Sequence, residues 1–346
     1  MINLNRGNNI DIIFISTRKD ISLASYRIWV NDLAHYFNEI DIESKILSNI
    51  DEKNKNKISK TTIIIIAKTD VKDYLFYRKN YPNNVLGIIN PPGQSKYDVD
   101  FIIVGSIEEK DSLSQNKNIF LFPLIENKFQ NIDRKNYKVT QQERLTLGYH
   151  GSYTHLAKFS PNLSYAIEEL SKECDISLKV IMDKASPKWK VGKPNINSIE
   201  IIEWSLKTFS DDILSCDIGL VPNISDNTPC LISKNDVRGL YKTDYFFRMK
   251  NKSNAGRMFV FIQHGIPVIA DLTPSNMHIL GQPKNGYAVF NKYGWLSALR
   301  ELKDVKNREV VARNALNSFN DLYNPIVWAE DLLANMKDVL NEKYVK

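Results

Sequence analysis

Apolar residues in the first third of the chain alternate between short uninterrupted runs and stretches with helical spacing. An uninterrupted run is typical of a strand covered on both faces of a parallel sheet, and apolar residues three or four apart are typical of a helix. The expected strands are residues 10–15, 61–67, 85–89, 101–104 and 119–122, and the expected helices are residues 23–37, 71–81 (capped by Asp70) and 107–113. This alternation predicts a doubly wound α/β sheet with right-handed crossovers.

The same pattern restarts after a polar interval without periodicity, residues 126–144, which we expect to be a linker. The expected strands of the second half are residues 145–149, 176–182, 218–222, 267–271 and 287–290, and the expected helices are residues 161–174, 206–215, 258–263, 293–302, 309–322 and 326–341. A chain of 346 residues is too long for one typical core. We therefore expect two domains, residues 1–138 and 139–324, and a terminal segment, residues 325–346.

One helix start in the second half is especially informative. Lys252, Ser253, Asn254 and Arg257 stand at the beginning of an apolar helix, which ends at Gly265 and leads into a buried strand. A helix start offers unpaired N–H groups and the positive end of the helix dipole, which together bind anionic groups. The stretch predicts a site for a phosphate-bearing ligand, although Asn254 would serve equally well as a helix cap.

Composition narrows the class of protein without defining it. The net charge of +6 is spread along the chain, which would suit anionic ligands or weak attachment to an acidic membrane surface but does not indicate nucleic-acid binding. The three cysteines are far apart and predict neither a disulfide framework nor a metal cluster. No apolar stretch reaches the length of a membrane span, and a cytoplasmic setting is the simplest expectation.

Several common enzyme motifs are absent from the sequence. There is no G-x-G-x-x-G for a dinucleotide, no G-x-x-x-x-G-K-[ST] for a nucleoside triphosphate, and neither H-E-x-x-H nor G-x-S-x-G. The sequence therefore gives no motif support for a nicotinamide-dependent enzyme or a P-loop enzyme.

Three segments in the second half carry a family resemblance. They read L-G-Y-H-G-S at 147–152, D-I-G-L-V-P at 217–222 and G-I-P-V-I-A at 265–270. In this order and spacing the chain resembles the GT-B glycosyltransferases, closest to the family 4-like (group 1) enzymes, as a divergent bacterial member. The resemblance implies two Rossmann-like doubly wound domains facing across a cleft, the second holding a nucleotide-sugar donor. It also implies that the terminal helix crosses back to the first domain.

The chain departs from the family at its best-known acidic motif. Many family 4 enzymes carry E-x7-E before G-x-P-V, and in this chain Lys252 and Val260 occupy those two positions. The residues present, including Lys252, Ser253 and Arg257, form a K-S-x-x-x-R version similar to that of divergent bacterial sugar transferases. They favour a diphosphate electrostatically and leave the nucleotide and the stereochemical outcome open.

The resemblance extends the set of candidate donor residues. Gly151 and Ser152 lie where a small residue would let the backbone approach phosphates, although an ordinary tight turn including His150 fits as well. Lys158 is near the position where family members place a phosphate-binding lysine. The candidate catalytic groups are Asp20, which would also suit a helix cap, and His150, which would also suit a half-buried position beside a strand end.

Further candidates lie where the acceptor side of the cleft is expected. They are Thr17, Arg18, Ser25, Arg27, Asn90 and Gly93 in the first half, with Asp244 and Arg248 in a long polar segment of the second. Ordinary loop charges would explain the last two equally well.

The resemblance implies a hexosyltransferase-like enzyme that uses no metal or other cofactor, because fixed cations and a helix start can stabilise the leaving diphosphate. The implied acceptor is a glycan or a lipid-linked sugar of a surface polysaccharide or glycoconjugate, with peripheral attachment at the inner face of the membrane. A nucleotide-sugar epimerase on the same architecture and a non-catalytic sugar-nucleotide binding protein remain open alternatives.

Overall fold

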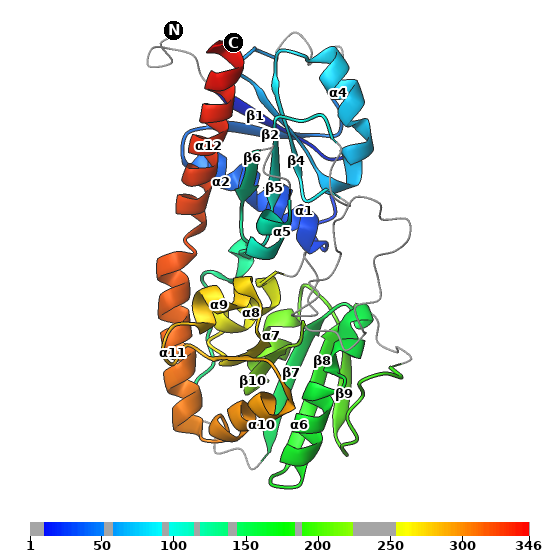
Figure 1. Ribbon diagram of the computed structural model, residues 1–346, viewed down its shortest axis with the longest axis vertical. Coiled ribbons are helices and arrows are strands. Elements are labelled where there is room, and N and C mark those ends of the chain that lie inside the picture. Colours follow the sequence, from blue (N-terminus) through cyan, green and yellow to red (C-terminus); the bar gives the residue numbers. More distant parts are fainter. Residues whose placement is uncertain are drawn as a thin grey trace. The chain divides into compact units, whose positions relative to one another are not determined.

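The computed structural model describes residues 10–51, 58–91, 97–113, 118–137, 144–183, 189–223 and 254–345. The chain divides into two compact units (Figure 1). The first unit comprises Met1–Asn127 and Tyr323–Lys346, and the second comprises Lys128–Leu322. These divisions fall after residues 127 and 322, whereas the sequence pattern placed them after residues 138 and 324.

The sheet of the first unit has six parallel strands in the order β2-β1-β3-β4-β5-β6. Its strands are β1 (Asp11–Ile15), β2 (Glu43–Leu47), β3 (Ile63–Ile66), β4 (Val85–Ile89), β5 (Phe101–Val104) and β6 (Asn118–Leu121). Five of them confirm the apolar runs. Strand β2 was not expected from the sequence, because it is an edge strand of alternating exposed and half-buried residues and contains no uninterrupted apolar run.

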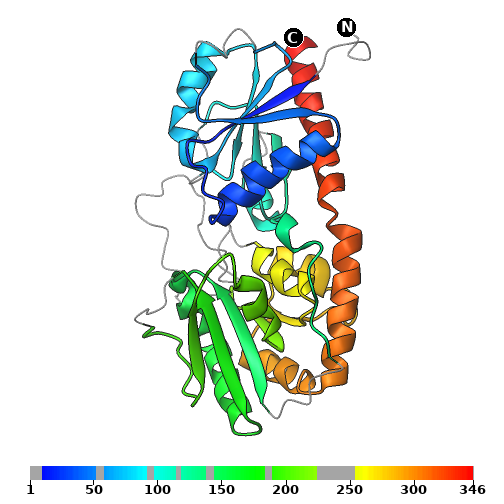
Figure 2. The same ribbon diagram turned by 180° about the vertical axis from the view of Figure 1, so that it is seen from behind.

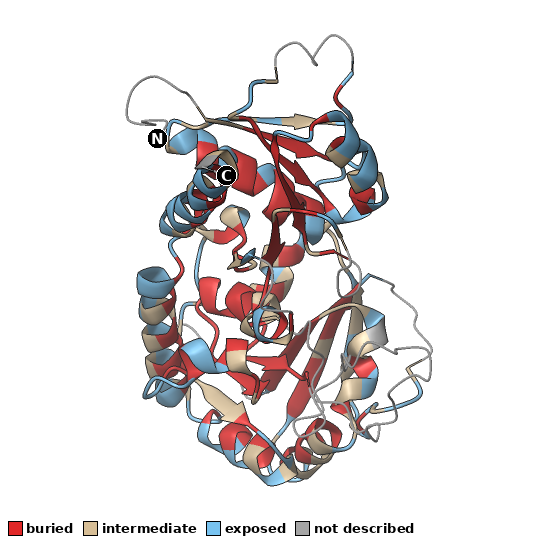
Figure 3. Cartoon of the chain, turned by 45° about the horizontal axis from the view of Figure 1, so that its top comes forward, coloured by how far each residue is buried: buried red, intermediate tan, exposed pale blue. Residues whose placement is uncertain are grey.

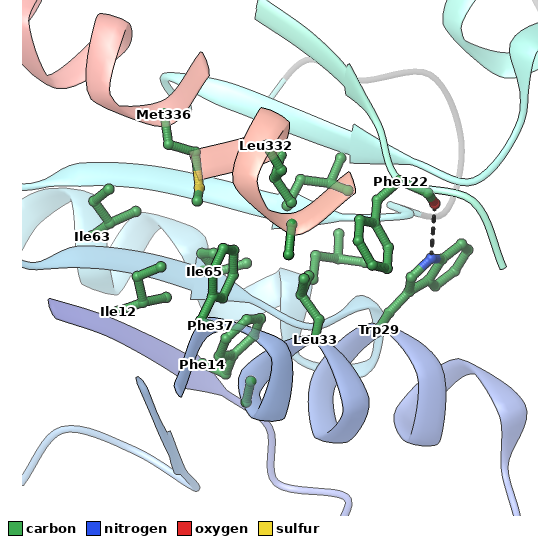
Figure 4. Close-up of a cluster of buried hydrophobic side chains, with 14 of the residues drawn as sticks. Ile12, Phe14, Trp29, Leu33, Phe37, Ile63, Ile65, Phe122, Leu332 and Met336 are labelled. Carbon is green, nitrogen blue, oxygen red and sulfur yellow. Dashed lines mark hydrogen bonds between the residues drawn. The ribbon is translucent and has the colours of Figure 1, made fainter. Parts of the chain in front are cut away.

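Helical segments cover both faces of this sheet because successive strand residues point to opposite sides. One face packs on a continuous helical segment made of α1 (Ala24–Tyr26), the π-helical η1 (Arg27–Asp32) and α2 (Leu33–Glu39), seen in blue in Figure 2, and on α12 (Pro325–Val345). Figure 4 shows side chains of α2 and α12 packed on this face of β1 and β3.

The opposite face packs on η2 (Lys68–Asp73), α4 (Tyr74–Asn80) and α5 (Ile107–Ser112). The four inner strands, β1, β3, β4 and β5, are buried on both sides, as their red colour in Figure 3 shows. The expectation that Asp70 caps the second helix was wrong. Asp70 lies inside η2, its carboxylate is buried, and it accepts hydrogen bonds from Thr17 and Thr69.

The sheet of the second unit also has six parallel strands, in the order β12-β11-β10-β7-β8-β9. Its strands are β7 (Leu145–Gly151), β8 (Ile176–Met182), β9 (Ile199–Glu203), β10 (Ile218–Val221), β11 (Val268–Asp271) and β12 (Tyr287–Val289). Strand β9 was not expected from the sequence, and like β2 it is a half-exposed edge strand. Strand β7 is longer than expected, so His150 and Gly151 belong to the strand and not to a turn.

The helices of the second unit are α6 (Asn162–Ser171), α7 (Phe209–Leu214), α8 (Gly256–Gln263), α9 (Pro274–Leu280), α10 (Lys292–Glu301) and α11 (Val305–Leu322), with short 3₁₀ segments η3 (Asn127–Phe129) and η4 (Tyr153–Phe159). Helices α6 and α10 contribute to the core on one face of the sheet. Helix α8 packs on the other face through Phe261. A Cβ placed at Gly219 would lie 2.4 Å from the Phe261 ring. The glycine of the D-I-G-L segment is therefore required for close packing of α8.

The interval expected to be a linker is mostly part of the second unit, which corrects that prediction. The Lys135 ammonium lies 3.2 Å from the Asp217 carboxylate, and both side chains are buried. The Tyr137 hydroxyl donates to the Gly265 carbonyl at 2.9 Å. The Phe129 ring packs on Phe209. These anchors are too widely spaced to produce a periodic pattern, so the segment looked unstructured in the sequence.

Within the described residues, no helix combines the length and the apolar character that crossing a membrane requires.

Candidate functional site

The second sheet has a topological switch between β7 and β10. The chain leaves β7 toward β8 and β9 on one side, and then returns to place β10 on the other side. In open parallel sheets, ligands bind outside the carboxyl ends of the strands at such a point. At this edge lie Gly151 at the end of β7, Asn223 just after β10, and the start of α8 with Arg257.

Arg257 reaches from the first turn of α8 to the end of β10. Its Nη2 donates to the Pro222 carbonyl at 3.0 Å and also to the Asn223 side-chain oxygen. The guanidinium lies 5.7 Å from the centre of the Tyr149 ring. Its Nη1 is buried without a hydrogen-bond partner, and among the described residues no carboxylate forms an ion pair with this side chain. The residue as a whole is half-buried, but a buried guanidinium nitrogen without a partner is costly unless an acceptor binds to it.

Asn223 adds a second hydrogen-bond donor without a partner, close to that of Arg257. The side chain is 2% exposed, and its Nδ2 is buried without a hydrogen-bond partner. The bond from Arg257 to Oδ1 assigns the amide orientation, so Nδ2 is the atom left over. The backbone N–H of Asn223 donates to the Asp271 carboxylate at 2.6 Å, and the Trp295 indole donates to the other oxygen at 3.1 Å. These bonds hold the loop after β10 in place.

Gly151 permits the close approach of the two loops. Its φ of +143° is one that side-chain-bearing residues rarely adopt, and a Cβ there would lie 3.1 Å from the Arg257 side chain. Ser152 follows, and its hydroxyl donates to the Asp183 carboxylate at 3.3 Å. The Tyr149 hydroxyl donates to the Ser152 carbonyl at 3.1 Å. Burial raises the pKa of Tyr149, so the phenol stays protonated and able to donate.

His150 is a core residue in this structure. Its ring packs edge-on against Phe209 and Phe261, and its Nε2 lies 3.0 Å from the Arg257 carbonyl. Burial lowers the pKa of His150 to about 3, so the imidazole is neutral and donates to that carbonyl. This contact fixes the first turn of α8 to β7. The position suits a residue that orients Arg257 better than one that exchanges protons with a substrate.

The other residues predicted to bind the nucleotide-sugar donor do not all lie at this edge of the sheet. The Asn254 side chain accepts a hydrogen bond from the Gly256 N–H at 3.1 Å, which is the capping role. Lys158 lies in η4, after the Ser152 turn. Lys252 and Ser253 fall outside the described residues. Asn223 and Asp183 were missed in the sequence, where the available signal was a polar side chain directly after a buried strand.

The first unit contains a pocket at the equivalent place, the switch between β1 and β3. Two acceptor candidates, Arg18 and Ser25, line it. The described lining residues are Ser16, Arg18, Leu23, Ser25, Tyr26, Trp29, Val30, Ala67, Lys68, Thr69 and Ile89. The empty volume is about 320 Å³, including space open to solvent.

Other acceptor candidates have structural partners. Arg27 forms a buried bidentate pair with Glu126, at 2.8 and 2.7 Å, and its remaining nitrogen donates to the Ile21 carbonyl at 2.6 Å. Each nitrogen of the guanidinium therefore has a protein partner, which is a structural role, and a substrate contact by Arg27 stays a prediction. Thr17 binds the Asp70 carboxylate through both its N–H and its hydroxyl.

Asp20 and Asn90 lie in loops and do not line the pocket. The exposed Asp20 carboxylate accepts hydrogen bonds from the Ser22 hydroxyl and N–H, which lower its pKa. Asn90 follows β4 with a φ of +44°, and its N–H donates to the Ile103 carbonyl at 2.8 Å. Gly93, Asp244 and Arg248 fall outside the described residues.

No protein-family model and no curated protein sequence matches the chain. Solved structures do match. Anabaena HepE, solved with UDP and glucose, has a TM-score of 0.58 at 9% identity, covering 95% of this chain and all of that one. TarM of S. aureus, solved with UDP, fondaparinux and α-GlcNAc-glycerol, has a TM-score of 0.56 at 11% identity and covers 82% of this chain. The pneumococcal O-GlcNAc transferase GtfA, solved with UDP and GlcNAc, has a TM-score of 0.50 at 13% identity and covers 84%.

The chain spans only 56% of TarM and 58% of GtfA. At these identities the likeness shows the fold, which is the two-sheet α/β architecture of the GT-B glycosyltransferases. The fold class expected from the sequence is thereby confirmed.

Proposed function

We propose that the chain is a glycosyltransferase that binds the diphosphate of a nucleotide-sugar donor at the switch between β7 and β10. The observation that carries this proposal is the Arg257 guanidinium, which has two hydrogen bonds through one nitrogen, a second buried nitrogen without a partner, and no ion pair with a carboxylate of the described residues. The bound UDP of HepE, TarM and GtfA supports a UDP-sugar as the donor.

The proposed chemistry follows from charge that develops on the leaving diphosphate. As the glycosidic bond breaks, negative charge grows on the phosphate oxygens, and preorganised donors stabilise it. Arg257 Nη1 and Asn223 Nδ2 supply two such donors, and the N–H groups at the start of α8 add the positive end of a helix dipole. Lys252, Ser253 and Lys158 stay candidates for the same phosphates.

We propose that this donor set acts without a metal ion, because a guanidinium, an amide and a helix start already match a diphosphate. In the same proposal the transferred group is a hexose, and the acceptor is a glycan or lipid-linked sugar used in a surface polysaccharide or glycoconjugate. Peripheral attachment at the inner face of the membrane belongs to the same proposal.

The test is calorimetric titration with UDP and measurement of hydrolysis of UDP-, GDP-, CMP- and dTDP-sugars, each with and without EDTA. Wild type should bind UDP and release it from one UDP-sugar whether or not EDTA is present. Arg257→Gln should weaken UDP binding at least tenfold, which corresponds to about 1.5–3 kcal/mol for a hydrogen bond to a charged group.

The matched control is Arg300→Gln, which removes an exposed arginine of the same unit that pairs with Glu173. It should bind UDP as wild type does. Tight binding with neither hydrolysis nor transfer to any acceptor would overturn the transferase proposal. Unchanged UDP binding by Arg257→Gln would show that the phosphates lie elsewhere.

A further inference from the structure

We propose that the pocket of the first unit binds a phosphate monoester carried on an apolar or ring-bearing body, so that the acceptor is a phosphorylated molecule. The identification of this ligand as the acceptor rests on the proposed transferase function. The pocket's ligand chemistry is derived from the first unit alone.

The pocket lies where the topology of the first sheet favours a ligand. The chain passes from β1 to β2 on one side and returns to form β3 on the other, so the loops after β1 and β3 diverge. Ser16 and Arg18 follow β1, and Lys68 and Thr69 follow β3, so the polar lining comes from these two carboxyl ends.

The charge of the lining favours an anion. Arg18 and Lys68 are cations, and none of the eleven described lining residues is acidic. The Ser16 and Thr69 hydroxyls already donate to the Arg18 carbonyl and the Asp70 carboxylate, whereas Ser25 adds a hydroxyl that can donate to a ligand. The Arg18 guanidinium makes no hydrogen bond or ion pair with any described residue. An arginine, a lysine and the Ser25 hydroxyl match the oxygens of a phosphate better than the hydroxyls of an uncharged sugar.

The rest of the lining is apolar and is built into the core. Tyr26, Trp29 and Val30 come from the end of α1 and from η1, where the helix is wound as a π-helix, a form often found at functional sites. The Trp29 indole donates to the Phe122 carbonyl at 3.4 Å, as the dashed line in Figure 4 shows. A fixed aromatic and aliphatic wall would contact the non-phosphate part of the ligand.

The two loops that carry the cations are tied together beneath the pocket. The buried Asp70 carboxylate accepts the Thr17 N–H at 3.2 Å and the Thr69 hydroxyl at 2.6 Å, so the residues next to Arg18 and Lys68 share one anchor. The hydroxyls of Thr17 and Thr69 donate to opposite oxygens of that carboxylate. The residues next to the two cations are therefore joined through one buried carboxylate that is not among the described lining residues.

Two sources offer this chemistry, a lipid phosphate and a soluble sugar phosphate. Calorimetry of the full chain with saturating UDP, which fills the proposed donor site, would compare hexyl phosphate with hexanol and glucose 6-phosphate with glucose. The phosphorylated member of at least one pair should bind, and its uncharged partner should bind at least tenfold more weakly. Preference for hexyl phosphate identifies the lipid source, and preference for glucose 6-phosphate identifies the soluble one.

Variants assign the binding to this pocket. Arg18→Gln and Lys68→Gln should each weaken phosphate binding at least fivefold, and Ser25→Leu, which fills the exposed rim, should weaken it similarly. Lys72→Gln is the matched control, since Lys72 is an exposed lysine of η2 that does not line the pocket. Equal binding by the three pocket variants and wild type, or equal binding of charged and uncharged probes, would overturn the proposal.

The two proposals fail separately. UDP titrations of the same variants should match wild type, because Arg18 and Lys68 belong to the first unit and Arg257 to the second. If UDP does not bind while phosphate binding still depends on Arg18, the donor proposal fails and the pocket stands. If UDP binds and turns over while the pocket variants leave phosphate binding unchanged, the pocket proposal fails alone.

Discussion

Each sheet has a topological switch, and an arginine lies near each one, buried in the case of Arg27 and half-buried in the case of Arg257. In the first unit, each nitrogen of Arg27 has a partner, with two bonds to Glu126 and bonds to the Ile21 and Ser22 carbonyls. In the second unit, Arg257 has carbonyl and amide partners, no carboxylate partner among the described residues, and one nitrogen without any partner. A guanidinium near a ligand-binding edge is therefore no evidence of a ligand by itself. The presence or absence of a compensating carboxylate separates a structural arginine from a candidate binding arginine.

The same contrast is the reason for proposing different ligands at the two switch points. The second site places its donors inside the fold, next to Gly151, where a fixed group such as a diphosphate would be held in one geometry. The pocket of the first unit has exposed cations over an apolar wall, an arrangement that accommodates a phosphate with a variable body. Two parallel sheets of the same fold class thus leave ligand chemistry to the residues that follow the strands.

The largest expected effect is that of removing the carboxylate that pairs with Arg27 in the first unit. Glu126→Ala leaves the Arg27 guanidinium buried and without its carboxylate, and breaking a buried pair from one side costs about 3–5 kcal/mol. Urea denaturation should show this loss in the free energy of unfolding. The double variant Arg27→Met/Glu126→Leu should recover most of it, since it leaves no unpaired charge. A loss below about 1 kcal/mol for Glu126→Ala would contradict the structural role of the pair.

Removing Arg257 from the second unit should have the opposite effect, with little change in stability and a large loss of ligand binding. Arg257→Ala deletes an uncompensated cation, so the free energy of unfolding without ligand should change little. UDP should stabilise wild type and should stabilise the variant far less, because ligand stabilisation follows the dissociation constant. Thermal unfolding with and without UDP measures both quantities. A large loss of stability without UDP would mean that Arg257 is structural, like Arg27.

A third test uses the two buried histidines of the second unit. Burial lowers the pKa of His150 to about 3 and that of His264 to about 4. The unfolded chain therefore binds more protons than the folded chain below pH 6.5, and stability falls as the pH falls through this range. Each histidine contributes a loss of about 1.4 kcal/mol per pH unit between its unfolded and folded pKa values. His150→Gln should reduce this slope between pH 6 and 5, and an unchanged slope would contradict the buried neutral state.

The sequence predicted the interior of both sheets well because parallel strands buried on both faces leave uninterrupted apolar runs. It missed β2 and β9, where half-exposed edge positions mix polar and apolar residues. It also missed α9, a single short helix capped by Thr273.

At the site, the local pattern of a helix start was enough to find Arg257. Its partner Asn223 and the Glu126 partner of Arg27 lie 34 and 99 residues away along the chain. No local pattern predicts such pairs, because only the fold brings them together. The candidate list therefore contained a structural arginine and a binding candidate that the sequence alone could not separate.

The smallest expected effect concerns Asp20, the acidic candidate for general-base chemistry in the first unit. Its carboxylate is exposed and already accepts the Ser22 N–H and hydroxyl, and these bonds lower its pKa, whereas an efficient general base has a pKa near the working pH. Asp20→Asn should therefore change the rate of sugar transfer by less than about threefold, as exposed substitutions usually do. Loss of a general base would instead slow transfer by about 100-fold or more. Steady-state rates at several pH values decide between the two, and a drop of that size would make this exposed loop, and not the lining of the pocket, the centre of the chemistry.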